Sequence, residues 1–157
     1  MNQLLFMSLI FLLLPVSAVE EADRAFHAMD YQLAIRMYET HLHQNKDSEA
    51  QWKLARAYLC SGDITTGAER EMFYRKALTA VESSIQLDRT NSQAYAWYAA
   101  CLGSVAIFEG SESKIKACYK IKAALDTALI LDPTNDVAWS VLGSYYKALG
   151  GINWFER

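Results

Sequence analysis

Apolar residues recur along this chain at spacings of three and four, the spacing that places side chains on one face of an α-helix. Between 30 and 43, for example, Tyr31, Ala34, Ile35, Tyr38 and Leu42 form such a stripe. Turn residues and helix-capping residues separate one stripe from the next. The pattern predicts helices over residues 19–29, 30–43, 48–60, 66–87, 91–107, 112–131 and 135–149.

The sequence repeats itself with a period of 44 residues. The segment 87–91 (LDRTN) returns as 131–135 (LDPTN), and the pairs Leu54-Ala55, Tyr98-Ala99 and Leu142-Gly143 hold the same place in three successive units. A fixed period of this size is typical of stacked helix pairs. We therefore predict an all-α fold, a right-handed superhelical stack of antiparallel helix pairs, in which Leu142 is buried and Gly143 permits a close helix approach.

Several residues are expected to begin or end these helices. Asp47 or Ser48, Asn91 and Asn135 can accept the unpaired backbone N–H groups of a first helical turn. Thr66 with Glu69 has the spacing of a capping box. Gly62 and the pair 150–151 are expected to stop the preceding helices.

The first 18 residues form a separate object. An apolar run over 4–14 is followed by Pro15 and by the small residues of 16–18, which is the form of a secretory signal peptide, although no Lys or Arg precedes the run. We expect cleavage after residue 18 and export to a secreted or periplasmic location. The alternative is a short hydrophobic membrane anchor.

The chain ends in the middle of a pattern. After Gly151 the segment 152–157 begins a new element, and its apolar residues Trp154 and Phe155 have no partner helix in the sequence. A stacked repeat exposes an apolar face when half of its last pair is missing. We therefore expect 19–157 to be one helical repeat domain that is truncated at its C-terminus.

Composition and motifs narrow the function. With 52% hydrophobic and 21% charged residues the chain of 157 residues is globular. Its net charge of −3 and pI near 5.6 argue against general nucleic-acid binding. No phosphate-binding loop and no nucleophile motif occur, so we expect no enzymatic activity and no cofactor. His41 and His43 are two residues apart and point to different sides of a helix, so no metal site is expected.

The three cysteines are Cys60, Cys101 and Cys118, an odd number for a disulfide framework. All three fall within predicted helices. We expect them to be small buried hydrophobic side chains, while a Cys60–Cys101 bridge between neighbouring helices stays open.

Two sets of motifs carry a family resemblance. Ala138-Trp139 and Leu142-Gly143-x-x-Tyr146, after Leu131-Asp132-Pro133, resemble the tetratricopeptide consensus, with a second helix about ten residues longer than usual. Over 97–157, the runs WYAACL, EG, KIK, AL-x-LDP, LG and the closing W-x-x-R resemble the regulator of microtubule dynamics family. This resemblance implies a non-enzymatic adaptor behind an N-terminal hydrophobic segment. It also implies association with microtubules and, in one branch, membrane tethering and phospholipid carriage. The signal-like N-terminus departs from that pattern.

In tetratricopeptide stacks the first helix of each pair lines the concave face. By this resemblance, the row expected to line a groove is Glu49, Trp52, Arg56, Gln93, Ala96, Ala100, Ser140, Ser144 and Lys147. The side chains in the middle of this row are small. Trp52 with Arg56 would form an anchoring edge, because Trp and Arg are favoured interface residues. In the alternative, Trp52 packs against the first helix near Phe26 and Arg56 is solvated.

Four lysines crowd one predicted helix: Lys114, Lys116, Lys120 and Lys122. They flank its apolar stripe on both sides. They are either a solvated face whose stems cover neighbouring side chains or a basic patch for anionic lipid or acidic tails.

Together these features predict a scaffold that binds a protein or peptide in its concave groove. The alternative is a carrier of phospholipid or another apolar ligand. A scaffold predicts an open, polar groove, whereas a carrier predicts a closed cavity lined by Tyr95, Ala96, Ala100 and similar side chains.

Overall fold

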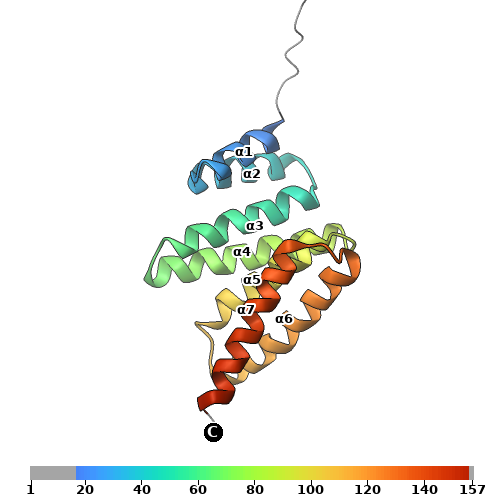
Figure 1. Ribbon diagram of the computed structural model, residues 1–157. Coiled ribbons are helices and arrows are strands. Elements are labelled where there is room, and N and C mark those ends of the chain that lie inside the picture. The colour runs from blue at the N-terminus through green and yellow to red at the C-terminus, as the bar shows by residue number, and fades with distance from the viewer. Residues whose placement is uncertain (1–16, 156–157) are drawn as a thin grey trace, which may run out of the picture.

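The computed structural model describes residues 17–155, and the side chains of 17–110 and 112–150. Within that range the chain forms seven α-helices and no strand. They are α1 (Ala18–His27), α2 (Tyr31–Gln44), α3 (Ser48–Asp63), α4 (Gly67–Leu87), α5 (Ser92–Ala106), α6 (Ser111–Leu131) and α7 (Asp136–Phe155). Successive helices pack as the pairs α1/α2, α3/α4 and α5/α6, with α7 added last (Figure 1). The predicted all-α stack of helix pairs is confirmed.

Most helices begin at a polar residue that accepts a backbone N–H, and the predicted caps are among them. The Asp47 carboxylate accepts from Ala50 N at 3.1 Å, and the Asn91 amide oxygen accepts from Ala94 N at 3.1 Å. The Asn135 amide oxygen accepts from Ala138 N at 2.8 Å. Each bond pairs one of the donors that a helix start leaves free.

The first helix has a cap that was not expected from the sequence. Ser17 and Glu20 form a capping box, in which the Ser17 hydroxyl accepts from Glu20 N and the Glu20 carboxylate accepts from Ser17 N. Ser17 belongs to the predicted signal segment, most of which lies outside the described residues. Cleavage after residue 18 stays a prediction, and it would remove this cap.

Three expectations about helix ends are wrong. Thr66 precedes α4 but makes no side-chain cap bond, because α4 starts at Gly67 in the left-handed region (φ 62°) and Arg70 donates to the carbonyl oxygens of Gly62 and Thr65. Gly62 lies inside α3, where an added Cβ would be 2.4 Å from the Tyr74 ring, so it serves close packing. The helix α7 continues through 150–151 to Phe155, since glycine inside a helix costs only about 1 kcal/mol.

The expectation for Gly143 is also wrong. A Cβ added there would meet no described atom within 4 Å, so no close helix approach depends on it. Leu142, which was expected to be buried, is only half-buried, because it lies at the edge of the core.

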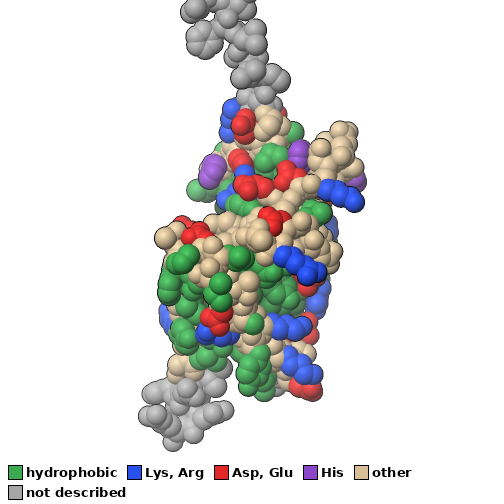
Figure 2. Space-filling model, turned by 90° about the vertical axis from the view of Figure 1, so that its right-hand side faces the viewer, with side chains coloured by type: hydrophobic (Ala, Val, Ile, Leu, Met, Phe, Trp, Pro, Cys, Tyr) green, Lys and Arg blue, Asp and Glu red, His purple; other side chains and the backbone are tan. Residues whose placement is uncertain are grey.

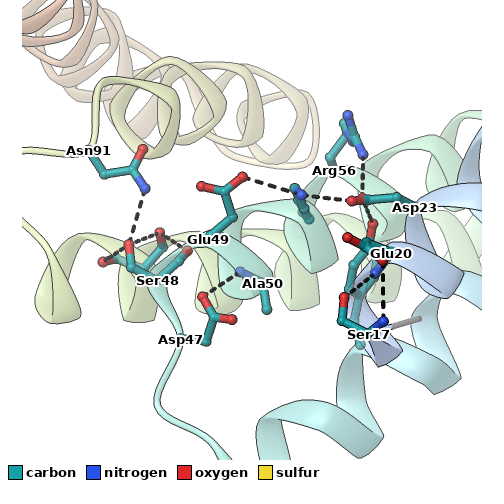
Figure 3. Close-up of polar contacts among 12 residues, drawn as sticks. Ser17, Glu20, Asp23, Asp47, Ser48, Glu49, Ala50, Arg56 and Asn91 are labelled. Atoms are coloured by element: carbon teal, nitrogen blue, oxygen red, sulfur yellow. Dashed lines mark hydrogen bonds and ion pairs between the residues drawn. The ribbon is translucent and has the colours of Figure 1, made fainter. Parts of the chain in front are cut away.

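A hydrogen-bonded joint repeats with the period of the sequence and explains part of that period. Asn91 Nδ2 donates to Ser48 Oγ at 3.2 Å, and Ser48 Oγ donates to the Ser84 carbonyl oxygen (Figure 3). One unit later Asn135 Nδ2 donates to Ser92 Oγ at 2.7 Å, and Ser92 Oγ donates to the carbonyl oxygen of Ala128. In each unit the equivalent Asn thus caps one helix and also ties that helix to the first helix of the preceding pair.

The core forms two clusters that share α5. The larger one joins α1 to α5 and includes Tyr38 and Trp52, and the smaller one joins α5 to α7 around Leu125 and Ala138. Leu78 and Tyr98 contact both clusters, so the stack is continuous. Among the described residues no helix is long and apolar enough to span a membrane.

Candidate binding groove

The predicted groove row divides into buried and accessible residues. Trp52 is 8% exposed and Ala96 is fully buried, so neither side chain is available on an open surface. Arg56, Gln93 and Ala100 are half-buried, and the remaining members Glu49, Ser140, Ser144 and Lys147 are exposed. The accessible part of the row therefore lies mainly on α5 and α7.

The expected exposed Trp52–Arg56 edge is not formed, because α1 covers it. The Arg56 guanidinium carbon lies 3.8 Å from the centre of the Phe26 ring and 5.3 Å from that of Trp52. Trp52 belongs to the core cluster against which Phe26 packs. This is the position that the sequence analysis gave as the alternative for Trp52. Arg56, however, is not simply solvated: its side chain is 16% exposed and its Nη2 lies 3.7 Å from Asp23 Oδ1 (Figure 3).

Asp23 of α1 ties this closed end together electrostatically. Its carboxylate accepts hydrogen bonds from Lys53 Nζ at 2.7 Å and from the Tyr38 hydroxyl. Burial by itself would raise the pKa of Asp23, but these two hydrogen bonds and the positive charges of Lys53 and Arg56 outweigh it, so the pKa lies below its usual value. Burial, followed by the bond to Asp23, raises the pKa of the Tyr38 hydroxyl.

The other end of the same face is open. A hollow of about 730 Å³ lies between α5, α6 and α7. Three members of the predicted row line it, Ala100, Ser140 and Ser144, together with Lys114 of the lysine set. Its other lining residues are mostly small or apolar: Tyr74, Ala99, Gly103, Ser104, Ala106, Ile107, Ala117, Cys118, Ile121, Val141, Tyr145, Ala148 and Leu149.

The hollow exists because of residue size at two repeat positions. The position held by Trp52 in α3 is held by Ala96 in α5 and Ser140 in α7, and the position of Arg56 is held by Ala100 and Ser144. Small side chains leave unfilled space between α5 and α7. Ala100, Ser140 and Ser144 of the predicted row thus line a hollow. Its α6 wall was not predicted, because the repeat register names only first helices.

A second hollow, which no sequence pattern indicated, lies on the other side of the stack. It has a volume of about 750 Å³ and lies over α3 between α2 and α4. Charges of both signs line it, among them Glu39, Glu71, Arg75 and Lys76. Tyr58 at its floor donates to the Glu39 carboxylate, and Lys76 lies 5.5 Å from the centre of the Tyr58 ring.

Among the described residues the three cysteines form no disulfide. Cys60, Cys101 and Cys118 are free thiols, with Cys101 fully buried and the other two half-buried. No group of three His, Cys, Asp or Glu side chains in the described part of the chain is arranged to hold a metal ion.

Solved structures share this arrangement of helices. The first tetratricopeptide domain of human RPAP3 has a TM-score of 0.66 at 18% identity, covering 85% of this chain and 91% of that domain. The second domain of human RPAP3, solved in complex with an HSP70 peptide, has a TM-score of 0.63 at 20% identity, with 83% and 92% covered. At this identity the likeness shows the fold alone.

Sequence comparison gives the family. The family model described as "Regulator of microtubule dynamics protein 1-3" matches residues 18–157. Regulator of microtubule dynamics protein 1 of Bos taurus is 26% identical over 144 residues, which cover 88% of this chain and 44% of that protein. The Mus musculus protein 1 is 30% identical over 132 residues, covering 81% and 41%, so the chain spans less than half the length of these relatives. With a family match over nearly the whole described region and a tetratricopeptide-like stack, the chain belongs to the regulator of microtubule dynamics family.

Proposed function

We propose that the protein is a non-catalytic scaffold that binds a segment of a partner protein in the hollow between α5, α6 and α7. The observation that carries this proposal is the open hollow of about 730 Å³ on the first-helix face, at Ala100, Ser140 and Ser144. A related fold in human RPAP3 was solved with a peptide bound. That likeness supports a peptide as the guest here.

The lining describes the chemistry of the guest. Most of its side chains are apolar or small, which favours an apolar side chain of the partner as the anchor. Within the described part of the chain, Lys114 is the one charged side chain that lines the hollow. We therefore infer that the guest carries a carboxylate near its apolar anchor, placed to pair with the Lys114 ammonium group.

A carrier of fatty acid or phospholipid is the second candidate. The observation that favours it is the same apolar lining with one cation at its edge, in a hollow within the 300–1,000 Å³ range typical of small-ligand pockets. The hollow is not the fully closed cavity expected of a carrier, since Ser140 and Ser144 are exposed.

Filling the hollow tests the scaffold proposal. Peptides would be selected from a displayed random library against the parent protein, and their Kd measured by calorimetry. We expect Ala100→Leu combined with Ser144→Leu to weaken binding more than about tenfold, because the added side chains occupy the guest's space. Helicity and the thermal midpoint should change little.

A matched control uses the second hollow. Thr79→Leu adds a similar side chain there and should leave the Kd unchanged. Selected peptides that bind the filled variant as tightly as the parent would contradict the proposal.

A fluorescent fatty acid separates the two candidates. A carrier function predicts that it binds the parent, that unlabelled phospholipid displaces it, and that the filled variant loses it. Peptide binding without fatty-acid binding favours the scaffold.

Microtubule association and export remain proposals. The family name supports the first, but this chain covers less than half of those relatives. Co-sedimentation with polymerised tubulin tests it, and absence from the pellet would contradict it. N-terminal sequencing of the native protein tests export: a start near Val19 supports cleavage, and a retained Met1 supports the anchor.

A further inference from the structure

The outward face of α6 carries a stripe of exposed apolar side chains. Ile115 is 60% exposed, Tyr119 is 75% exposed and Ile130 is 80% exposed. Their spacing of four and eleven residues places all three on one side of the helix. The opposite side of α6, with Ile121, Leu125 and Ala128, packs in the core. The stripe is therefore not used for packing among the described residues.

Lysines flank this stripe on both sides. Lys116 and Lys120 follow its apolar residues around one side of the helix, and Lys122 lies on the other. Figure 2 presents the side of the molecule on which α6 lies, and hydrophobic and Lys or Arg side chains lie side by side on its lower half. The helix carries four lysines against Glu112 and Asp126, whereas the whole chain has a net charge of −3.

These lysines are free to change partners. Lys116 pairs with Glu112 at 2.7 Å and Lys122 with Asp126 at 2.7 Å, both within exposed turns of the same helix. Exposed pairs of this kind are weak and are easily replaced by another anion. In the part of the chain that the structure describes, Lys114 and Lys120 have no carboxylate within ion-pair distance.

The equivalent face of α4 is different. One repeat earlier, the positions of Ile115, Tyr119 and Ile130 are held by Glu71, Arg75 and Gln86. Arg75 there pairs with Glu71 at 2.7 Å and with Glu109 at 3.1 Å. The repeat fold thus does not require apolar residues at these positions, whereas α6 carries apolar residues at all three.

We propose that this face of α6 docks on an anionic lipid surface. The apolar stripe would lie at the level of the lipid headgroups, while the lysine stems extend along it and their ammonium groups reach lipid phosphates and carboxylates. Lysine is a compact point charge on a flexible stem, which suits the many geometries of a headgroup layer. Ile115, Tyr119 and Ile130 are absent from the linings of both hollows, so docking uses a face separate from the proposed binding groove.

Vesicle flotation of the full chain tests the proposal. Phosphatidylcholine vesicles would be compared with vesicles that also contain phosphatidylserine, at low and high salt. We expect preferential binding to the anionic vesicles that weakens as salt screens the lysines. The apolar run over 4–14 is common to all variants and can bind both kinds of vesicle. The readout is therefore the partition coefficient on anionic vesicles divided by that on phosphatidylcholine vesicles.

Two double variants identify the face. Lys116→Gln with Lys120→Gln should lower the partition coefficient on anionic vesicles about 30-fold, the conversion of about 1 kcal/mol for each lysine near the surface. Ile115→Ser with Tyr119→Ser should weaken binding to the same vesicles. As a control of equal charge change, Lys46→Gln with Lys76→Gln should retain the anionic preference of the parent.

Several results would overturn the proposal. The parent could show no preference for anionic vesicles, or the Lys116/Lys120 variant could keep the preference of the parent. The Lys46/Lys76 control could also lose as much of that preference as the Lys116/Lys120 variant does. Circular dichroism checks that each variant is folded. If the Ile115/Tyr119 variant unfolds, the comparison of the Lys116/Lys120 variant with the parent still tests the proposal. A face that binds a protein instead would give a parent indifferent to both kinds of vesicle.

Discussion

The two ends of the stack use the same repeat positions for opposite purposes. Towards the N-terminus, Trp52 and Arg56 of α3 fill the space under α1, and Phe26 closes it. Towards the C-terminus, Ser140 and Ser144 of α7 hold the same positions and leave a hollow. The backbone repeat thus sets where the helices lie, whereas the side chains at these two positions differ between the filled end and the end with the hollow.

The two ends also differ in charge. Two carboxylates, Asp23 and Glu49, balance the two cations Lys53 and Arg56 at the closed end. Lys53 Nζ lies 2.7 Å from Asp23 Oδ2 and 3.3 Å from Glu49 Oε1. At the open end Lys114 is the one charged residue among the described residues that line the hollow. Charged side chains thus pair with one another at the closed end, whereas at the open end the Lys114 side chain lines the hollow.

The largest expected effect breaks the closed end. Trp52→Ala removes a buried side chain that packs in the larger core cluster, and it should lower the free energy of unfolding by about 3–5 kcal/mol. Ser140→Ala, at the same repeat position, should change it by less than about 0.5 kcal/mol. Urea unfolding followed by circular dichroism measures both. Similar losses in the two variants would contradict the difference between the ends.

The next effect concerns the joint that both ends share. Asn135 is 2% exposed, caps α7 and donates to Ser92 Oγ, so Asn135→Ala should cost about 2 kcal/mol. Asn91 is half-buried with a longer bond of 3.2 Å to Ser48, and Asn91→Ala should cost about 1 kcal/mol. Chemical unfolding at neutral pH shows which of the two variants loses more free energy of unfolding. A larger loss for Asn91→Ala would mean that the joint does not depend on burial.

A smaller effect on the free energy of unfolding depends on pH and concerns Asp23 at the closed end. Because the folded state holds the pKa of Asp23 below its ordinary value, its stabilisation is present above that ordinary value and is lost as the pH falls through the lowered pKa. Asp23→Asn should cost about 1–2 kcal/mol at pH 7, and the difference from the parent should shrink below about pH 4. Asp126→Asn, in an exposed pair on α6, should cost less than about 1 kcal/mol. A difference for Asp23→Asn that stays constant down to pH 2 would contradict this role.

The sequence predicted the helix order, the repeat and most helix starts, because periodicity and capping are local properties. It also predicted that Ala100, Ser140 and Ser144 share one row, since the repeat register carries one unit onto the next. It left open whether Trp52 lines the groove or packs near Phe26, because the repeat register does not say whether α1 covers the row. The capping box at Thr66 failed for a similar reason: Gly67 takes a left-handed conformation and Arg70 binds the neighbouring carbonyl oxygens.

The reach of α7 shows a second limit of sequence patterns. Gly150 and Gly151 were expected to end the helix, but the helix continues to Phe155. Glycine only weakens a helix, whereas a helix stops at a glycine when the neighbouring residues hold it in a left-handed conformation. The same holds for Gly62, whose role in packing against Tyr74 is set by a residue of the next helix.

The face formed by α5 and α7 carries an open hollow, and the three free thiols test this openness without a known ligand. Cys118 lines the hollow, whereas Cys101 is fully buried and burial raises the pKa of its thiol, which further lowers its reactivity. Alkylation with iodoacetamide, followed by mass spectrometry of the peptides, should modify Cys118 more than about tenfold faster than Cys101. Ser144→Leu should slow Cys118 and leave Cys60 unchanged. Alkylation of Cys118 as slow as that of Cys101, or unaffected by Ser144→Leu, would contradict an open hollow.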